Sequence, residues 1–69
     1  MVIKNNIKKL RHINNGMTQH DLSLLTGIPR ETIAQYETDR AIPSVGNCIL
    51  LAEALGVSIA EICYMEENE

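Results

Sequence analysis

The sequence contains very few cysteines: Cys48 and Cys63 are the only two among its 69 residues. Two cysteines at this separation make neither a disulfide framework nor a zinc site. His12 and His20 have no carboxylate, cysteine or second histidine at metal-ligand spacing, so we expect surface histidines, no metal and no cofactor. Both cysteines fall at apolar positions of predicted helices, and we therefore expect them to be small core residues.

Long apolar runs are absent as well. No stretch could span a bilayer, and the charged N-terminus MVIKNNIKKL has no continuous apolar run of the signal-peptide kind, so we expect a cytoplasmic protein with no membrane association. With 45% hydrophobic and 22% charged residues, the composition is that of a folded protein. A chain this short can make one domain only, and we expect it over residues 1–69 with a frayed tail at 65–69. The stability that so small a core provides is marginal without a partner copy.

Basic residues are missing from the second part of the chain. Residues 1–40 contain all six Lys and Arg against four Asp and Glu, a net charge of +2, whereas residues 41–69 contain five Glu and no base, a net charge of −5. The overall charge of −3 disfavours nucleic acid as a partner. The asymmetry restores that possibility, because a local basic face can meet phosphate while the remainder stays acidic.

Helical periodicity and capping residues predict an all-α fold of five helices, and no alternating run is long enough for a confident strand. The predicted helices span about residues 3–13, 19–26, 29–37, 45–55 and 59–65. Two capping boxes, Thr18 with Asp21 and Ser58 with Glu61, mark the starts of the second and fifth helices. Ser44 has the position of an N-cap for the fourth.

Apolar residues at helical spacing predict which side of each helix is buried. The predicted core consists of Ile3, Ile7, Leu10, Leu22, Leu25, Ile28, Ile33, Tyr36, Val45, Cys48, Leu51, Ala52, Leu55, Ile59, Ile62 and Cys63. Gly27 ends the second helix in the manner of a C-cap, and Ile28 after it is placed to fill the angle between two helices. Pro29 fits the first turn of the third helix, where a missing N–H costs nothing.

The segment TQHDLSLLTGIPRETIAQYE combines two short helices with a turn centred on Gly27, so that the second helix must cross the first steeply. This geometry lets the first helix sit against the sugar–phosphate backbone while the second enters the major groove, which is about 12 Å wide. The segment resembles the helix-turn-helix family of phage repressors, the Cro and cI type, also called xenobiotic-response-element-like. The residues that carry the resemblance are Thr18, Gln19, Leu22, Gly27, Ile28, Thr32, Ile33, Tyr36, Glu37, Pro43, Ser44 and the run 52–58 (AEALGVS).

The resemblance covers residues 3–64 and implies a five-helix, lambda-repressor-like DNA-binding domain with its helix-turn-helix at the second and third helices. Three residues depart from the family pattern. Ser23 stands where the family prefers Ala, and Thr26 replaces an apolar residue. Pro29 replaces the usual Ser or Thr cap, which is expected to loosen the start of the recognition helix by about 1 kcal/mol. These departures affect the pose of Arg30, not the fold.

The resemblance also implies which residues meet the bases. Arg30 would fork onto guanine O6 and N7, Gln35 would pair with adenine, and Glu31 would accept from cytosine N4. Thr32 lies beside them at the N-terminal end of the recognition helix. Each has an alternative: Glu31 stabilises the first turn of any helix, Gln35 can be only a soluble surface residue, and Arg30 can serve a phosphate without reading a base.

Contacts with the DNA backbone are expected from four residues: Thr18, Gln19, Arg40 and Lys9. Gln19, at the start of the second helix, would bond a phosphate with the help of the helix terminus. Arg40 would meet phosphate from the following loop. The basic residues of the first helix (Lys4, Lys8, Lys9 and Arg11) have a competing interpretation, a merely solvated face. Tyr36 is expected to point into the core rather than to stack on a base.

Double-stranded DNA is therefore the expected partner, bound by a homodimer on an inverted repeat. The expected dimer surface is the fifth helix and the residues after it (Ile62, Tyr64 and Met65), although local packing is an equal alternative for Tyr64. The leading hypothesis is a sequence-specific transcriptional regulator, specifically a repressor.

A second hypothesis comes from a different class. An antitoxin or adaptor would use the same fold to hold a protein partner, and the acidic second part of the chain favours this reading. An enzyme is the weakest hypothesis, because the sequence offers no nucleophile–base pair, no phosphate-cradling glycine loop and no clustered metal ligands.

Overall fold

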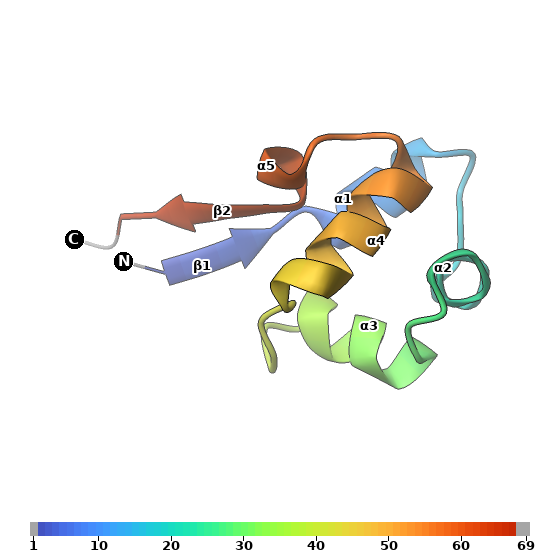
Figure 1. Ribbon diagram of the computed structural model, residues 1–69, viewed down its shortest axis with the longest axis horizontal. Helices are drawn as coiled ribbons and strands as arrows, with labels where there is room; N and C mark the ends of the chain where they lie inside the picture. The colour runs from blue at the N-terminus through green and yellow to red at the C-terminus, as the bar shows by residue number, and fades with distance from the viewer. Residues whose placement is uncertain (1, 68–69) are drawn as a thin grey trace.

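Five helices and two strands follow one another along the chain, and the computed structural model describes residues 2–67 of it. The helices form one group, called here the helical body: α1 (Ile7–Ile13), α2 (Gln19–Thr26), α3 (Arg30–Glu37), α4 (Val45–Leu55) and α5 (Ile59–Ile62). Strands β1 (Val2–Asn5) and β2 (Cys63–Glu66) form the arm, which projects from the body along the long axis of the molecule (Figure 1). The molecule measures 37 × 21 × 21 Å.

The arm corrects the expectation of an all-α chain. β1 and β2 pair antiparallel, with Ile3 opposite Met65 and Asn5 opposite Cys63. Residues 3–5 therefore do not begin the first helix, and residues 63–65 do not end the fifth. Local periodicity could not reveal this pairing, because it joins the two ends of the chain. Met65 and Glu66, expected in a frayed tail, are paired instead, and residues 68–69 of that expected tail lie outside the described residues.

The predicted start and end of α2 are confirmed. Thr18 Oγ1 accepts from the backbone N–H of Asp21 at 3.0 Å, and Asp21 Oδ2 accepts from the backbone N–H of Thr18 at 3.1 Å. Gly27 ends the helix in the left-handed conformation at φ 78°, which costs glycine little and other residues more. These contacts act within a few residues, which is why the sequence predicts them well.

The predicted starts of α4 and α5 are also confirmed, and that of α3 shifts by one residue. Ser44 Oγ accepts from the backbone N–H of Asn47 and caps α4, and the Glu61 carboxylate accepts from the backbone N–H of Ser58 at 2.9 Å before α5. Pro29 is the N-cap of α3, at φ −56° and ψ 141°, rather than its first helical residue. The fixed φ of proline is compatible with either position.

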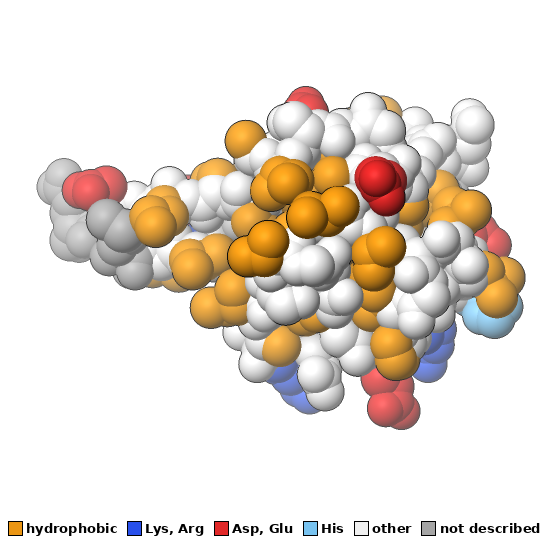
Figure 2. Space-filling model, in the orientation of Figure 1, with side chains coloured by type: hydrophobic (Ala, Val, Ile, Leu, Met, Phe, Trp, Pro, Cys, Tyr) orange, Lys and Arg blue, Asp and Glu red, His pale blue; other side chains and the backbone are white. Residues whose placement is uncertain are grey.

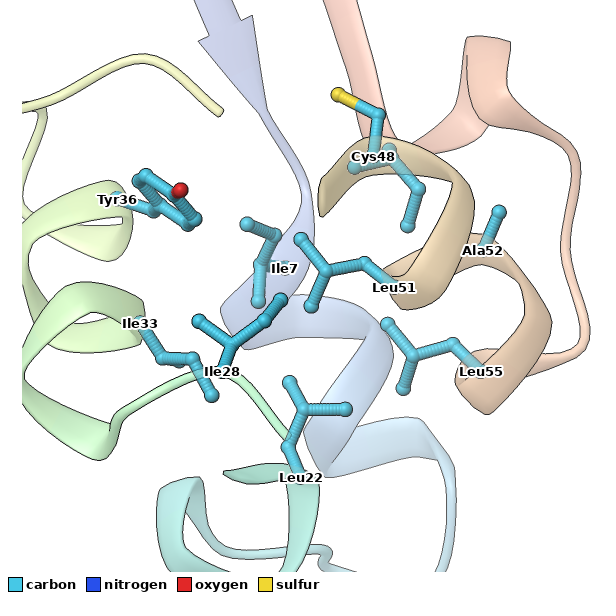
Figure 3. Packing of buried hydrophobic residues seen from close by; sticks show 10 residues of the cluster. Ile7, Leu22, Ile28, Ile33, Tyr36, Cys48, Leu51, Ala52 and Leu55 are labelled. Carbon is cyan, nitrogen blue, oxygen red and sulfur yellow. The ribbon is translucent and has the colours of Figure 1, made fainter. Parts of the chain in front are cut away.

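The core collects side chains from every helix of the body. Its members are Ile7, Leu22, Ile28, Ile33, Tyr36, Cys48, Leu51, Ala52, Leu55 and Ile62 (Figure 3). Ile28, only 3% exposed, points into the middle of this cluster, as expected for a residue that fills the angle between α2 and α3. Each large aliphatic side chain buried in this way stabilises the fold by roughly 1.5–3 kcal/mol.

Four residues expected in the core are exposed instead: Ile3, Leu25, Val45 and Ile59. Leu25 is 62% exposed and Val45 is 76% exposed. Both residues lie near the end of a helix, outside the part of the helix surface that packs on the core. The apolar face of each helix is therefore wider than the surface that it buries. Cys48 is buried as predicted, whereas Cys63 is half-buried.

Candidate nucleic-acid interface

The turn between α2 and α3 sets the angle of the candidate site. Gly27, Ile28 and Pro29 connect the helices, and α2 is seen end-on where α3 runs across the view (Figure 1). Ile28 is buried between the two helices, so its backbone polar groups need partners within the protein. The steep crossing leaves the outer face of α3 free of the rest of the body.

Ser23 and Thr26, two departures from the family pattern, supply those partners. Thr26 Oγ1 accepts from the backbone N–H of Ile28 at 3.1 Å, and Ser23 Oγ donates to the carbonyl of Ile28 at 2.6 Å. Thr26 also donates to the carbonyl of Leu22 at 2.8 Å. Both residues depart from the family pattern, and in the structure they hold the turn. The available signal was the tendency of Ser and Thr near a helix end to bond the local backbone.

The residues predicted to meet bases lie together along α3. Arg30, Glu31 and Gln35 are exposed and Thr32 is half-buried. Arg30, Glu31 and Gln35 border one open groove of about 340 Å³ together with Arg40 from the following loop. The opposite side of α3 carries the buried core residues, including Tyr36, which points inward as predicted. The polar face predicted for the third helix is therefore confirmed, while the base contacts themselves stay a prediction.

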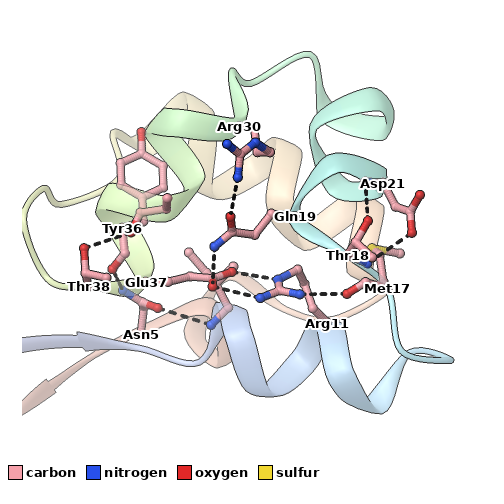
Figure 4. A network of polar contacts seen from close by, with 12 residues as sticks. Asn5, Arg11, Met17, Thr18, Gln19, Asp21, Arg30, Tyr36, Glu37 and Thr38 are labelled. Atoms are coloured by element: carbon pink, nitrogen blue, oxygen red, sulfur yellow. Dashed lines mark hydrogen bonds and ion pairs between the residues drawn. The ribbon is translucent and has the colours of Figure 1, made fainter.

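A chain of polar contacts runs behind this face, from Arg11 through Glu37 and Gln19 to Arg30 (Figure 4). Arg11 Nε and Nη2 donate to the two carboxylate oxygens of Glu37 at 2.7 and 2.8 Å, and Nη1 donates to the carbonyl of Met17 at 2.7 Å. Gln19 Nε2 donates to Glu37 Oε1 at 3.0 Å, while Gln19 Oε1 accepts from Arg30 Nη1 at 3.3 Å. We call these four residues the polar chain.

The polar chain contains a buried ion pair, because the side chains of Arg11 and Glu37 are only 7% and 4% exposed. Burial acts to raise the pKa of Glu37, but the hydrogen bonds from Arg11 and Gln19 and the charge of Arg11 outweigh it and lower the pKa below its ordinary value of 4.5. The hydrogen bond to Glu37 in turn raises the pKa of Arg11. Both groups are therefore charged at neutral pH and anchor the end of α3 to α1.

Arg11 corrects the expectation for the basic residues of the first helix. It was grouped with surface lysines, but it is 6% exposed and holds Glu37 inside the body. One signal could have shown this: Arg11 lies four residues after Ile7, on the same side of the helix. Its partner lies 26 residues away, so the sequence alone did not identify the pair.

The residues predicted to contact the DNA backbone fall into separate groups. Thr18, Gln19 and Arg30 border one open depression of about 380 Å³, with the exposed His12 and His20 on its rim. The Gln19 side chain is half-buried, and both ends of its amide are bonded within the protein. Thr18 uses its hydroxyl as a helix cap.

Lys9 and Arg40 are exposed elsewhere on the body. Lys9 borders a depression beside α1 that includes Glu37, while Arg40 shares the groove of α3. The surface view shows blue side chains with a red one between them along the edge occupied by α3, and many hydrophobic side chains over α4 (Figure 2). Basic side chains are thus present on the edge of the molecule that carries α3.

The predicted dimer residues do not share one environment. Ile62 is 0% exposed and packs in the core, so its assignment to a subunit surface is wrong. Tyr64 and Met65, on β2, are 40% and 66% exposed. Ile62 was misplaced because α5 ends directly after it and the chain then leaves the body as a strand.

Among residues 2–67, no three His, Cys, Asp or Glu side chains gather as ligands for a metal ion. Across the same residues, no helix has the length and apolar character needed to cross a membrane.

The helical body matches a known protein family. A family model described as Helix-turn-helix matches residues 7–62, which are the bounds of the body from the start of α1 to the end of α5. An uncharacterized HTH-type transcriptional regulator of Methanocaldococcus jannaschii is 34% identical over 67 residues, covering 97% of this chain and 100% of the relative. The similarity to this relative therefore extends through the arm, whereas the family match stops at its base.

Proposed function

The chain belongs to the Cro/cI-type helix-turn-helix family of DNA-binding transcriptional regulators, a non-enzymatic family, and we propose that it is a sequence-specific repressor that binds an inverted repeat as a homodimer. One observation carries this proposal: Arg30, Gln35 and Arg40 border the same open groove on the outer side of α3. Because the groove combines two base-reading side chain types with a cation, it suits duplex DNA. As a regulator of transcription, the protein acts in the cytoplasm, beside the chromosome.

Arg30 and Gln35 are the main base readers in this proposal. They lie five residues apart on α3, about 7.5 Å along the helix axis. This separation lets the two side chains reach different base pairs, Arg30 on guanine and Gln35 on adenine. Glu31 and Thr32 complete the reading surface at the start of the helix.

Gln19 prepares Arg30 for this role. Its amide oxygen accepts from Arg30 Nη1, and its amide nitrogen is held by Glu37 of the buried ion pair. An arginine that is already restrained loses less conformational freedom when it binds. Thr18, Lys9 and Arg40 are the proposed phosphate contacts around it, with the backbone of Gln19 at the start of α2.

The test of base reading starts from a selection of bound sequences out of a random duplex pool, followed by binding titrations of variants. Arg30→Ala and Gln35→Ala are each expected to weaken binding about tenfold to hundredfold and to relax the preference at one base position. Arg30→Lys is the matched control, because it keeps the charge but loses the fork. It should keep the salt dependence of binding and weaken the guanine preference. Unchanged base preferences in both alanine variants would remove the readout proposal.

The homodimer is proposed to form through the arm and the neighbouring α5. Tyr64, Met65 and Ile59 present 40%, 66% and 47% of their surface to solvent, and hydrophobic side chains continue from the body onto the arm in the surface view (Figure 2). A two-fold axis near β2 would bring the same residues of both copies together. Met65→Asp should leave binding to a single half-site unchanged and weaken binding to the inverted repeat. A strictly monomeric wild-type protein on operator DNA, by sedimentation, would contradict the dimer.

A protein-holding role, as in an antitoxin or adaptor, is the second candidate. Ile42, Val45 and Ile49 are 64%, 76% and 42% exposed around the start of α4, away from the groove of α3. This apolar surface and the acidic charge of residues 41–69 suit a protein partner. Co-purification with one stoichiometric partner, combined with DNA binding that does not respond to salt, would favour this candidate over the repressor, because phosphate contacts release counterions.

A further inference from the structure

The two thiols of the chain lie side by side, although they are 15 residues apart in the sequence. Cys48 Sγ belongs to α4 and Cys63 Sγ to the first residue of β2, and the two sulfur atoms are 3.7 Å apart. Packing of α5 against α4 brings them together, since β2 follows α5 directly. A disulfide has a sulfur–sulfur distance of about 2.05 Å, so the two sulfur atoms must move closer together for a bond to form.

We propose that Cys48 and Cys63 form a reversible intramolecular disulfide that cross-links strand β2 to helix α4. This goes beyond DNA binding, because neither cysteine lies at the groove of α3. The oxidant is a small-molecule disulfide, written RSSR. Thiol–disulfide exchange with such a molecule needs a thiol that is accessible and a second thiol close enough to complete the exchange.

The two cysteines are suited to different steps of this exchange. Cys63 is half-buried and meets the oxidant first, whereas Cys48 is 7% exposed and shielded from it. The Cys63 thiolate attacks one sulfur of RSSR, which forms a mixed disulfide and releases one RS⁻. The Cys48 thiolate then attacks Cys63 Sγ, which forms the Cys48–Cys63 bond and releases the second RS⁻. Two protein thiols are oxidised, one RSSR is reduced, and the two protons lost by the protein thiols convert the two released RS⁻ ions to RSH.

The surroundings make the exchange slow. Burial and the neighbouring Cys48 thiol raise the pKa of Cys63 to about 11. The thiolate is the reactive form and is therefore scarce at neutral pH. The disulfide thus responds to sustained oxidation rather than to brief exposure.

The cross-link would join the arm to the support of the recognition helix. Asn47, the residue before Cys48, donates from Nδ2 to the hydroxyl of Tyr36 at 2.8 Å. Asn5, which lies opposite Cys63 in the sheet, donates from Nδ2 to the carbonyl of Tyr36 at 2.8 Å. Oxidation therefore ties together two segments that both hold the inner side of α3, and it fixes the arm against the body.

The experiment compares the purified full chain after treatment with oxidised glutathione and after treatment with dithiothreitol. The proposal expects a monomer 2 Da lighter than the reduced chain, which is the loss of two hydrogens, with no glutathione attached. Because the bond closes a loop of about 15 residues, it should raise the melting temperature by about 10 °C or more. Amide exchange in β2 should slow in the oxidised form.

Controls are Cys63→Ser and Cys48→Ala, each of which should abolish the 2 Da loss and the shift in melting temperature. Cys48→Ala should instead keep one glutathione on Cys63, because the second thiol that releases it is missing. The wild-type comparison stands even where a variant folds poorly, because it uses one sequence in two redox states. Glutathione retained on the wild-type chain, a disulfide between two wild-type chains, or an unchanged melting temperature in the 2 Da lighter monomer would each overturn the proposal.

Discussion

The helical body and the arm are held together by different forces. The body buries ten hydrophobic side chains and one ion pair. None of the eight residues of β1 and β2, all within the described part of the chain, is fully buried, and the arm depends on backbone pairing between its two strands. The same division is seen in the family match, which covers residues 7–62 and thus the body alone. Side-chain packing supports α3 from within the body, whereas backbone pairing holds an arm whose side chains all stay at least partly exposed.

The largest expected difference between the two regions is the response to loss of a core side chain. Leu51, at 0% exposure, packs in the middle of the core, so Leu51→Ala should lower the free energy of unfolding by about 3 to 4 kcal/mol. The neighbouring Leu50 is 40% exposed, and Leu50→Ala is the matched control, with an expected loss below about 1 kcal/mol. Urea unfolding measures both. Equal losses would show that the body is not organised around the observed core.

The buried ion pair should come next. Glu37→Gln leaves the charge of Arg11 buried without a counter-charge but keeps one hydrogen-bond acceptor, so we expect a loss of about 2 to 3 kcal/mol. Arg11→Met combined with Glu37→Leu should recover much of that loss, because no charge is then buried. A double variant as unstable as Glu37→Gln would mean that the pair contributes by packing rather than by charge.

The Arg11–Glu37 pair also predicts that the stability of the fold decreases at low pH. The folded pKa of Glu37 lies below its ordinary value of 4.5, so protonation favours the unfolded chain. Its contribution to stability is complete above pH 4.5 and is lost as the pH falls through the lowered folded pKa. Unfolding free energies measured between pH 7 and pH 2 should therefore fall less steeply in Glu37→Gln than in the wild type. Parallel curves would assign the acid sensitivity to other carboxylates.

A smaller effect is expected at the start of α2. Thr18→Ala removes the acceptor for the backbone N–H of Asp21 and should cost about 1 kcal/mol of stability. Thr38→Ala is the matched control, since the Thr38 hydroxyl bonds the carbonyl of Ala34 at the end of α3 and caps no helix start. Its expected cost is below about 0.5 kcal/mol. Thermal unfolding of the two variants distinguishes them.

The smallest effect on global stability is expected in the arm. Tyr64→Gly weakens a strand that buries little surface, so the free energy of global unfolding should change by less than about 0.5 kcal/mol. Amide exchange of β1 and β2 should nevertheless accelerate several-fold while exchange in α3 and α4 stays the same. Faster exchange throughout the chain would show that arm and body unfold as one unit, and the distinction between them would fail.

The sequence predicted most of the body correctly and the arm incorrectly. The capping box at the start of α2 and the glycine at its end are local features, and they gave the limits of this helix to within one residue. The resemblance to the helix-turn-helix family placed Arg30, Glu31 and Gln35 on the outer face of α3, and all three are exposed there. Arg11 was missed, because the reason for its burial is a carboxylate on a distant helix.

What the sequence alone determined is the helix-turn-helix and its exposed face, since hydrogen bonds and periodicity within a few residues specify both. Tertiary structure decided the pairing of β1 with β2, the Arg11–Glu37 ion pair and the approach of Cys48 to Cys63. The partners in each case are far apart along the chain. Their contact depends on how the helices pack and on the entropy of closing the intervening segments, and no local pattern of residues reports either quantity.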